Sequence, residues 1–335
     1  MLSGTKKIYL LPMFFLGMVL IVLTSLRPIG IDADSLSYLE AYKLAQNGIY
    51  VISEPTFNFF SLISTTFFYD NNIGIGFLFF IYAGLSISIK FYTIYKYSSS
   101  IYLSILVYVC VFYILHEMTQ IRVGLASAFF LLGIHDLIMG NKRKYLMKIF
   151  LACLCHFSSL VLIPLVFVSA ERVNLKIILL TPVLMLCAVL IIGDMNPILI
   201  SLFQYLPEPL SSKAISYIVG VEQFGRFDSV NIFSKFTLSV FSFFILYTIA
   251  CAKGKCIKPA DIIFLKLFSI MLTLFYFFSS VPVLASRIFE LLAVSMILSF
   301  PEICKKIQPS WIITLVVSFW VCLYCYLVNL KLIGM

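Results

Sequence analysis

Apolar residues in this chain follow one another in long runs instead of alternating with polar residues. A helix needs about 20 such residues to cross a bilayer, whereas a membrane-spanning strand shows about ten residues in alternation. Since lipid cannot satisfy backbone polar groups, runs of this length predict helices. We expect an all-α, polytopic integral membrane protein with about ten transmembrane helices. The runs cover residues 8–26, 73–95, 101–116, 123–140, 145–170, 177–193, 231–252, 260–281, 288–303 and 310–330.

Two shorter segments depart from this pattern. Between Asp34 and Gln46, apolar side chains recur at helical spacing, and Gly48 follows, which predicts a short helix. Residues 56–69 are apolar but too short to cross a bilayer, which predicts a re-entrant or interfacial segment.

Composition agrees with the hydropathy pattern. The chain has 335 residues, of which 62% are hydrophobic and 12% charged, against about 25% charged in soluble domains. We therefore expect a single transmembrane domain over residues 1–335. The net charge of +9 favours anionic lipid or phosphate partners, and no basic stripe suggests nucleic acid. Most of the nine cysteines lie inside apolar runs, as inert buried thiols do.

The distribution of basic residues predicts which loops face the cytoplasm. Lys6 and Lys7 precede the first run, so the N-terminus is expected inside, and the run over 73–95 is expected to end inside at Lys90 and Lys96. Loops 27–55 and 194–230 are then expected outside, facing substrate.

Two loops on the same side of the membrane must be joined by an even number of crossings, and one part of the chain does not meet this requirement. Three apolar segments, 145–170, 177–193 and 231–252, lie between two basic clusters that are both expected inside. One of the three must therefore be broken or must not span. The polar sequence from His156 to Ser159 and the dipeptide Asn196-Pro197 are the candidate breaks.

Few ionisable residues remain near the outer helix ends, and such residues at membrane depth usually serve function. They are Asp34, Glu54, Arg122, His156 and Arg287. Arginine offers a planar fork that matches phosphate oxygens, so the two arginines predict a phosphate or pyrophosphate clamp.

For four of these residues a purely structural role stays open as an alternative. Arg122 could pair locally with Glu117, and Arg287 with Glu290. Asp34 could be the N-cap of its helix. His156 could be a general base, a donor to phosphate, or a packing residue bonded to a backbone carbonyl.

Several enzyme classes are disfavoured. His116-Glu117-Met118-Thr119-Gln120 lacks the second histidine of a zinc protease, and scattered histidines argue against a metal site. No nucleotide-binding loop is present, so we expect no cofactor.

The run Gln120-Ile121-Arg122-Val123-Gly124-Leu125-Ala126 resembles the QxRQGLA-type motif of the EpsG-like branch of the Wzy polysaccharide polymerases. Further matches are distributed along the chain. They are a basic loop at Asn141–Lys144, the segment from Ala152 to Leu160 around His156, Asp34-x-x-x-Tyr38, Glu54-Pro55 and the late arginine Arg287. Val123 departs from the family pattern, in which glutamine is commoner.

The resemblance implies a glycosyltransferase in the inner membrane of a bacterium, with its active site facing the periplasm. Such enzymes polymerise O-antigen or exopolysaccharide from oligosaccharide repeat units linked to undecaprenyl pyrophosphate. Arg122, Arg287 and Gln120 would bind the pyrophosphate, and Asp34, Glu54 or His156 would be the base. The implied partners are the lipid-linked oligosaccharides, membrane lipids and a chain-length regulator, without nucleic acid.

Three other activities stay open. A flippase or transporter for lipid-linked oligosaccharides would also use arginines in a cavity, although it would usually show internal repeats, and none is visible. A polysaccharide O-acyltransferase could use His156 as its base. An O-antigen ligase would share the chemistry but use a different acceptor.

Overall fold

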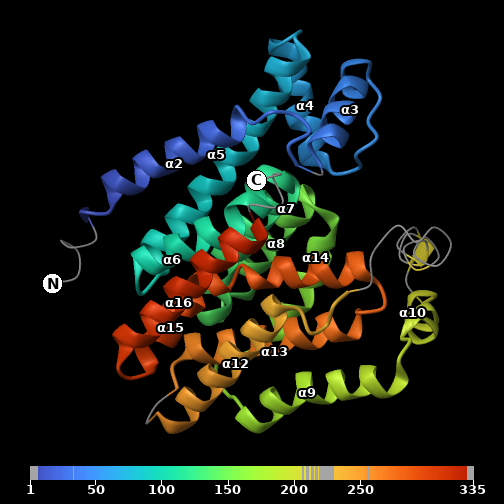
Figure 1. Ribbon diagram of the computed structural model, residues 1–335. Coiled ribbons are helices and arrows are strands. Elements are labelled where there is room, and N and C mark those ends of the chain that lie inside the picture. The colour runs from blue at the N-terminus through green and yellow to red at the C-terminus, as the bar shows by residue number, and fades with distance from the viewer. Residues whose placement is uncertain are drawn as a thin grey trace. The chain divides into compact units, whose positions relative to one another are not determined.

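The computed structural model describes residues 7–32, 34–205, 207–208, 211–212, 215, 218, 230–254 and 257–329 (Figure 1). Regular secondary structure in these residues is helical throughout, which confirms the predicted all-α membrane fold. About half of the predicted outer loop 194–230, 18 of its 37 residues, lies outside the described residues. The chain forms two compact units, one of Met1–Ser169 with Val294–Met335 and one of Ala170–Ala293. The expectation of a single membrane domain stays a prediction.

The first unit contains most of the helices. They are α2 (Leu10–Ser25), α3 (Ser35–Gln46), α4 (Pro55–Phe67), α5 (Asn71–Tyr97), α6 (Ile101–Val107), the π-helix η1 (Tyr108–Thr119), α7 (Ile121–Ile138), α8 (Lys142–Cys155), the 3-10 helix η2 (Phe157–Phe167), α15 (Met296–Lys306), α16 (Ser310–Tyr324) and the π-helix η3 (Cys325–Asn329). The short helix predicted after Asp34 is confirmed as α3. A helix also ends at His156, as the polar sequence there predicts.

The core of the first unit lies where α3, α4, α5, α7 and α8 meet. The hydroxyl groups of Tyr42 and Ser64 are 3.1 Å apart, and Ser64 donates a 2.7 Å hydrogen bond to the carbonyl of Gly74. These bonds join α3 and α4 to the start of α5. Gly74 allows this close approach, because a Cβ there would collide with the Tyr42 side chain.

The second unit contains α9 (Leu175–Ile192), α10 (Asn196–Phe203), α12 (Lys235–Lys253), α13 (Pro259–Phe277) and α14 (Pro282–Ala293). Helix α13 packs against α9, α12 and α14. The Ser269 hydroxyl on α13 donates a 2.8 Å hydrogen bond to the carbonyl of Ile178 on α9. A polar side chain inside an apolar bundle thus finds its partner on a neighbouring helix.

Within the described residues, seven helices are long and apolar enough to cross a membrane, and an eighth is counted if α14 and α15 form one bent span. This is fewer than the ten expected. Two apolar segments explain part of the difference, because α2 has 16 residues and η2 has 11, both shorter than a regular crossing. The run predicted over 288–303 is divided between α14 and α15.

Candidate functional site

Glu54 occupies the N-terminal end of α4. Pro55 follows it as the first helical residue, and Glu54 itself is extended, with φ −72° and ψ 125°. Both features follow from the sequence, because proline favours the first turn and excludes the helical conformation from the residue before it. The Glu54 side chain makes no capping hydrogen bond to its own helix. Its carboxylate is therefore available to more distant partners.

Glu54 joins two residues that are remote in the sequence. Its Oε2 lies 2.7 Å from Nη1 of Arg122, which is in the first turn of α7. Its Oε1 lies 3.1 Å from Nδ1 of His156, at the break between α8 and η2. All three side chains are largely buried; the most exposed, Arg122, retains 24% of its accessible surface. Three of the predicted site residues thus form one cluster.

The electrostatics of the cluster fix the charge of Glu54. Burial alone would raise the pKa of its carboxyl, but the hydrogen bond from His156 and the nearby charges of Arg122 and His156 outweigh burial. Together they lower the pKa of Glu54 to about 2. A carboxylate this acidic, with both oxygens already in hydrogen bonds, is a poor proton acceptor at neutral pH.

The guanidinium of Arg122 packs against aromatic side chains. The guanidinium of Arg122 lies over the ring of Tyr38, with its Cζ 5.5 Å from the ring centroid. Tyr38 belongs to α3 and stacks on Phe57 of α4 at a centroid distance of 5.9 Å. A cation held over an aromatic face gains electrostatic attraction. Helix α3 therefore contributes to the cluster through Tyr38.

Helix α7 begins directly after η1, with only Gln120 between the two helices. Gln120 has φ −101° and ψ 62°, and only 8% of its surface is exposed. Its Oε1 is buried and has no hydrogen-bond partner among the residues that the structure describes. Gln120 is thus buried between η1 and α7, two residues before Arg122.

Comparison with known families now adds to this geometry. The sequence model of the EpsG family matches residues 10–334. The chain belongs to the EpsG family. No curated protein and no solved structure matches it.

Asp34, a predicted catalytic residue, precedes α3 in this member of the EpsG family. It occupies the N-cap position of the helix, the alternative considered from the sequence, although its carboxylate makes no capping bond. Asp32 caps the helix instead, and its Oδ1 accepts hydrogen bonds from the backbone N–H groups of Asp34 and Ser35 at 3.0 and 2.9 Å. Asp34 is partly exposed four residues before Tyr38.

The two arginines differ in their local pairing. Arg287 lies on α14 in the second unit, with its Nη1 3.9 Å from Oε2 of Glu290, which is the local pair considered from the sequence. The corresponding alternative for Arg122, a local pair with Glu117, is wrong. Its carboxylate partner is Glu54, whereas Glu117 pairs with Lys90 of α5.

Sequence reasoning missed two features around the cluster. It placed Lys90 at the inner end of its helix, but this lysine is fully buried. It also missed Thr56, whose hydroxyl donates a 3.1 Å hydrogen bond to the carbonyl of Leu154 and lies 3.2 Å from the hydroxyl of Tyr82. A charged residue within an apolar run was the signal for Lys90. No local pattern distinguishes Thr56.

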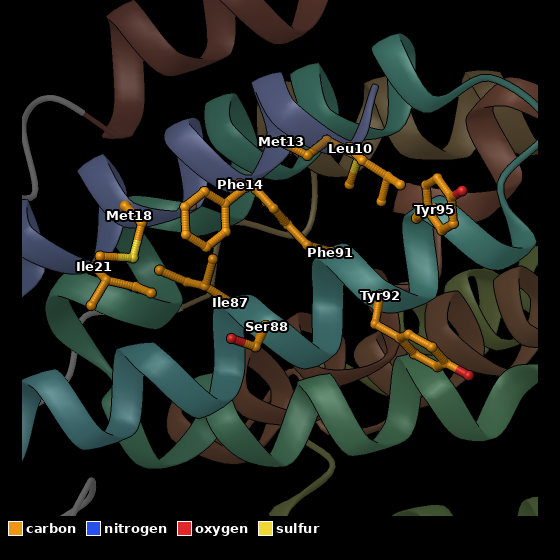
Figure 2. A pocket seen from close by; sticks show the side chains of 11 residues that line it. Leu10, Met13, Phe14, Met18, Ile21, Ile87, Ser88, Phe91, Tyr92 and Tyr95 are labelled. Atoms are coloured by element: carbon orange, nitrogen blue, oxygen red, sulfur yellow. The ribbon is translucent and has the colours of Figure 1, made fainter. Parts of the chain in front are cut away.

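An apolar cavity of about 310 Å³ lies between α2 and α5 in the first unit (Figure 2). It is lined by such residues as Phe14, Met18, Ile87 and Phe91, and by none of the predicted site residues. Within the described residues, no three His, Cys, Asp or Glu side chains gather as a metal site would require. The predicted site residues that the structure brings together in this unit are those of the cluster around Glu54.

Proposed function

We propose that this chain is a polymerase of O-antigen or exopolysaccharide. As a multi-pass member of the EpsG family, it is a membrane protein of polysaccharide biosynthesis. In the proposed reaction, the donor is a growing glycan on undecaprenyl pyrophosphate, and the acceptor is a lipid-linked repeat unit. The enzyme would act at the periplasmic face of the bacterial inner membrane, with membrane lipids and a chain-length regulator as further partners.

The observation that carries the proposal is the bridge from Arg122 through Glu54 to His156. The bridge joins an arginine, which could bind phosphate, and a histidine, which could act as a general base, to one carboxylate. Glycosyl transfer from a lipid pyrophosphate needs both functions, because negative charge develops on the leaving oxygen while a proton leaves the attacking hydroxyl.

His156 is the base that this geometry favours. An ionised Glu54 can only accept a hydrogen bond, so the bond between them requires a proton on Nδ1 of His156. In the neutral imidazole, Nε2 is then the basic nitrogen. Glu54 thus orients the ring and selects its tautomer, in the manner of the carboxylate in a Ser-His-Asp triad.

The bonds and charges of the proposed step balance. An acceptor hydroxyl oxygen attacks the anomeric carbon of the donor, and its proton passes to Nε2 of His156. The bond from the anomeric carbon to the pyrophosphate oxygen breaks, and the lipid pyrophosphate leaves with the electron pair. Arg122 and Gln120 would bind this anion. Energy is already stored in the donor, so no cofactor is required.

The test is glycan length on a gel, in cells that lack the gene and are complemented with wild type or with Arg122→Ala. A ladder that collapses to core plus a single repeat unit, and that only the wild type restores, supports polymerisation and a role for Arg122. Complete loss of surface glycan would instead favour a flippase or a ligase. An unchanged ladder would refute the proposal.

A further inference from the structure

A second charged cluster lies next to the first and contains a fully buried ion pair. Nζ of Lys90 on α5 is 2.5 Å from Oε1 of Glu117 in the last turn of η1, and the two side chains retain 0% and 1% of their accessible surface. The same oxygen accepts hydrogen bonds from the Ser86 hydroxyl at 2.9 Å and the Tyr108 hydroxyl at 3.1 Å. Removing two charges from water is costly, and only close contact with additional hydrogen bonds offsets that cost.

This ion pair is attached to both sides of the turn that carries Gln120. Glu117 precedes the turn by three residues. After the turn, the carbonyl oxygen of Gly124 lies 3.0 Å from the same Ser86 hydroxyl, whose single proton is shared between this carbonyl and Oε1 of Glu117. A Cβ at Gly124 would collide with the carbonyl oxygen of His116, so the first turn of α7 lies directly against the end of η1. Helix α5 therefore holds the two ends of the turn at one fixed separation.

Further polar contacts connect Glu117 to α3, the helix whose Tyr38 ring packs against Arg122. Nη1 of Arg27 donates a 3.0 Å hydrogen bond to the main-chain carbonyl of Glu117, and Nε of Arg27 lies 3.3 Å from Oδ2 of Asp32. Asp32 in turn caps α3, the helix that carries Tyr38. Polar contacts thus connect Glu117 to the Gln120 turn on one side and to the Tyr38 helix on the other.

We propose that Lys90 and Glu117 are positioning residues that fix Gln120 and Arg122 where an anionic group of the substrate is bound. The inference rests on the proposed function for the identity of that anion, a lipid pyrophosphate. Neither residue needs to touch substrate. Their effect passes through the turn, because a shift of about 1 Å in a binding group can weaken function about 100-fold.

The test replaces the ion pair with apolar residues of similar size, Lys90→Met with Glu117→Leu. Such a replacement often leaves stability nearly unchanged. The matched control is Lys148→Met with Asp136→Leu, which removes another ion pair of the first unit, between α8 and the far end of α7. Both double variants are purified in nanodiscs, and their thermal unfolding is compared with that of wild type.

Two readouts are measured on each protein. The first is the dissociation constant for undecaprenyl pyrophosphate. The second readout needs no substrate. Gln120→Cys is introduced into each protein, and the rate at which a maleimide labels this cysteine is measured, with the labelled site located by mass spectrometry. In the Lys90→Met/Glu117→Leu background we expect binding to weaken about tenfold or more, and labelling of the displaced turn to accelerate about tenfold. In the control double variant, Lys148→Met with Asp136→Leu, neither the dissociation constant nor the labelling rate should change by more than about twofold.

The outcomes separate the inference from the proposed function. Wild-type protein that does not bind the lipid pyrophosphate refutes the proposed function, while the labelling rate still decides the role of the ion pair. Unchanged labelling in the Lys90→Met/Glu117→Leu background overturns the inference, and so do equal changes in the control pair. If the double variant does not accumulate, Ser86→Ala keeps the ion pair but removes the hydroxyl between Glu117 and the carbonyl of Gly124, and it should accelerate labelling in the same direction; unchanged labelling there overturns the inference.

Discussion

Glu54→Gln is the substitution that best tests the cluster, because it changes charge while keeping shape. Glutamine has one oxygen and one amide nitrogen in place of the two carboxylate oxygens of Glu54. It can accept a hydrogen bond from Arg122 or from His156, but it cannot hold both as an anion does. The imidazole then loses the partner that selects its tautomer.

The magnitude follows from the pKa of Glu54. Its decrease from 4.5 to about 2 corresponds to about 3 kcal/mol of preference for the ionised carboxyl in the folded protein. Because the interaction is mutual, the carboxylate stabilises the arrangement of its partners on the same scale. A correctly placed general base contributes about 100-fold or more to turnover, so we expect Glu54→Gln to lower kcat by at least about 100-fold.

The same pKa predicts how acid affects the folded state. A carboxyl whose pKa is lowered by folding stabilises the protein fully above its unfolded pKa, and this contribution is lost as the pH falls through the folded value. The contribution of Glu54 should therefore be complete above pH 4.5 and decline toward pH 2. Glu54→Gln should unfold at a lower temperature than wild type at pH 7, and the gap should narrow across that window.

The assay is glycan synthesis by purified protein in nanodiscs supplied with lipid-linked repeat units, with protein amount measured in parallel. The matched control is Asp70→Asn, since Asp70 also precedes a helix of the first unit but uses its carboxylate to cap α5, accepting from the backbone of Asn72 and Ile73. Asparagine caps nearly as well, so this variant should keep full activity. Wild-type turnover by Glu54→Gln would refute the role given to the carboxylate.

Three further predictions concern neighbouring residues. Arg122→Lys should reduce polymerisation strongly although the positive charge is kept, because the planar fork over Tyr38 is lost; a normal ladder would argue against anion binding through the fork. His156→Asn should abolish polymerisation without lowering the amount of protein in membranes, and loss of the protein itself would indicate a packing role instead. Gly124→Ala should reduce membrane abundance, measured by immunoblot, because its Cβ meets the carbonyl oxygen of His116.

Local sequence patterns predicted the helices better than they predicted the partners of the charged residues. The long apolar runs, helix α3 and the helix end at His156 each follow from residues close together in the chain. The local partner that the sequence offered for Arg122 was Glu117, five residues away, but its partner Glu54 is 68 residues away. Helical spacing carries no information about such distant contacts.

The break between α14 and α15 shows the same limit within a helix prediction. Residues 288–303 read as one apolar run, but the structure divides that run between two helices. Hydropathy reports that a segment is apolar, and it does not report whether the segment is straight. For the candidate site, the sequence identified Arg122, Glu54 and His156 individually, whereas the bridge between them required the fold.

The buried pair of Lys90 and Glu117 also has a consequence for how this protein enters the membrane. The two residues lie 27 positions apart, on α5 and on the next candidate span, Ile101–Thr119, so the lysine leaves the ribosome well before its carboxylate partner. An unpaired lysine inside an inserting helix is disfavoured by up to about 3 kcal/mol. Helix α5 is therefore expected to remain at the insertion machinery until η1 has been synthesised, and the two helices would then pass into lipid together as a neutral hairpin.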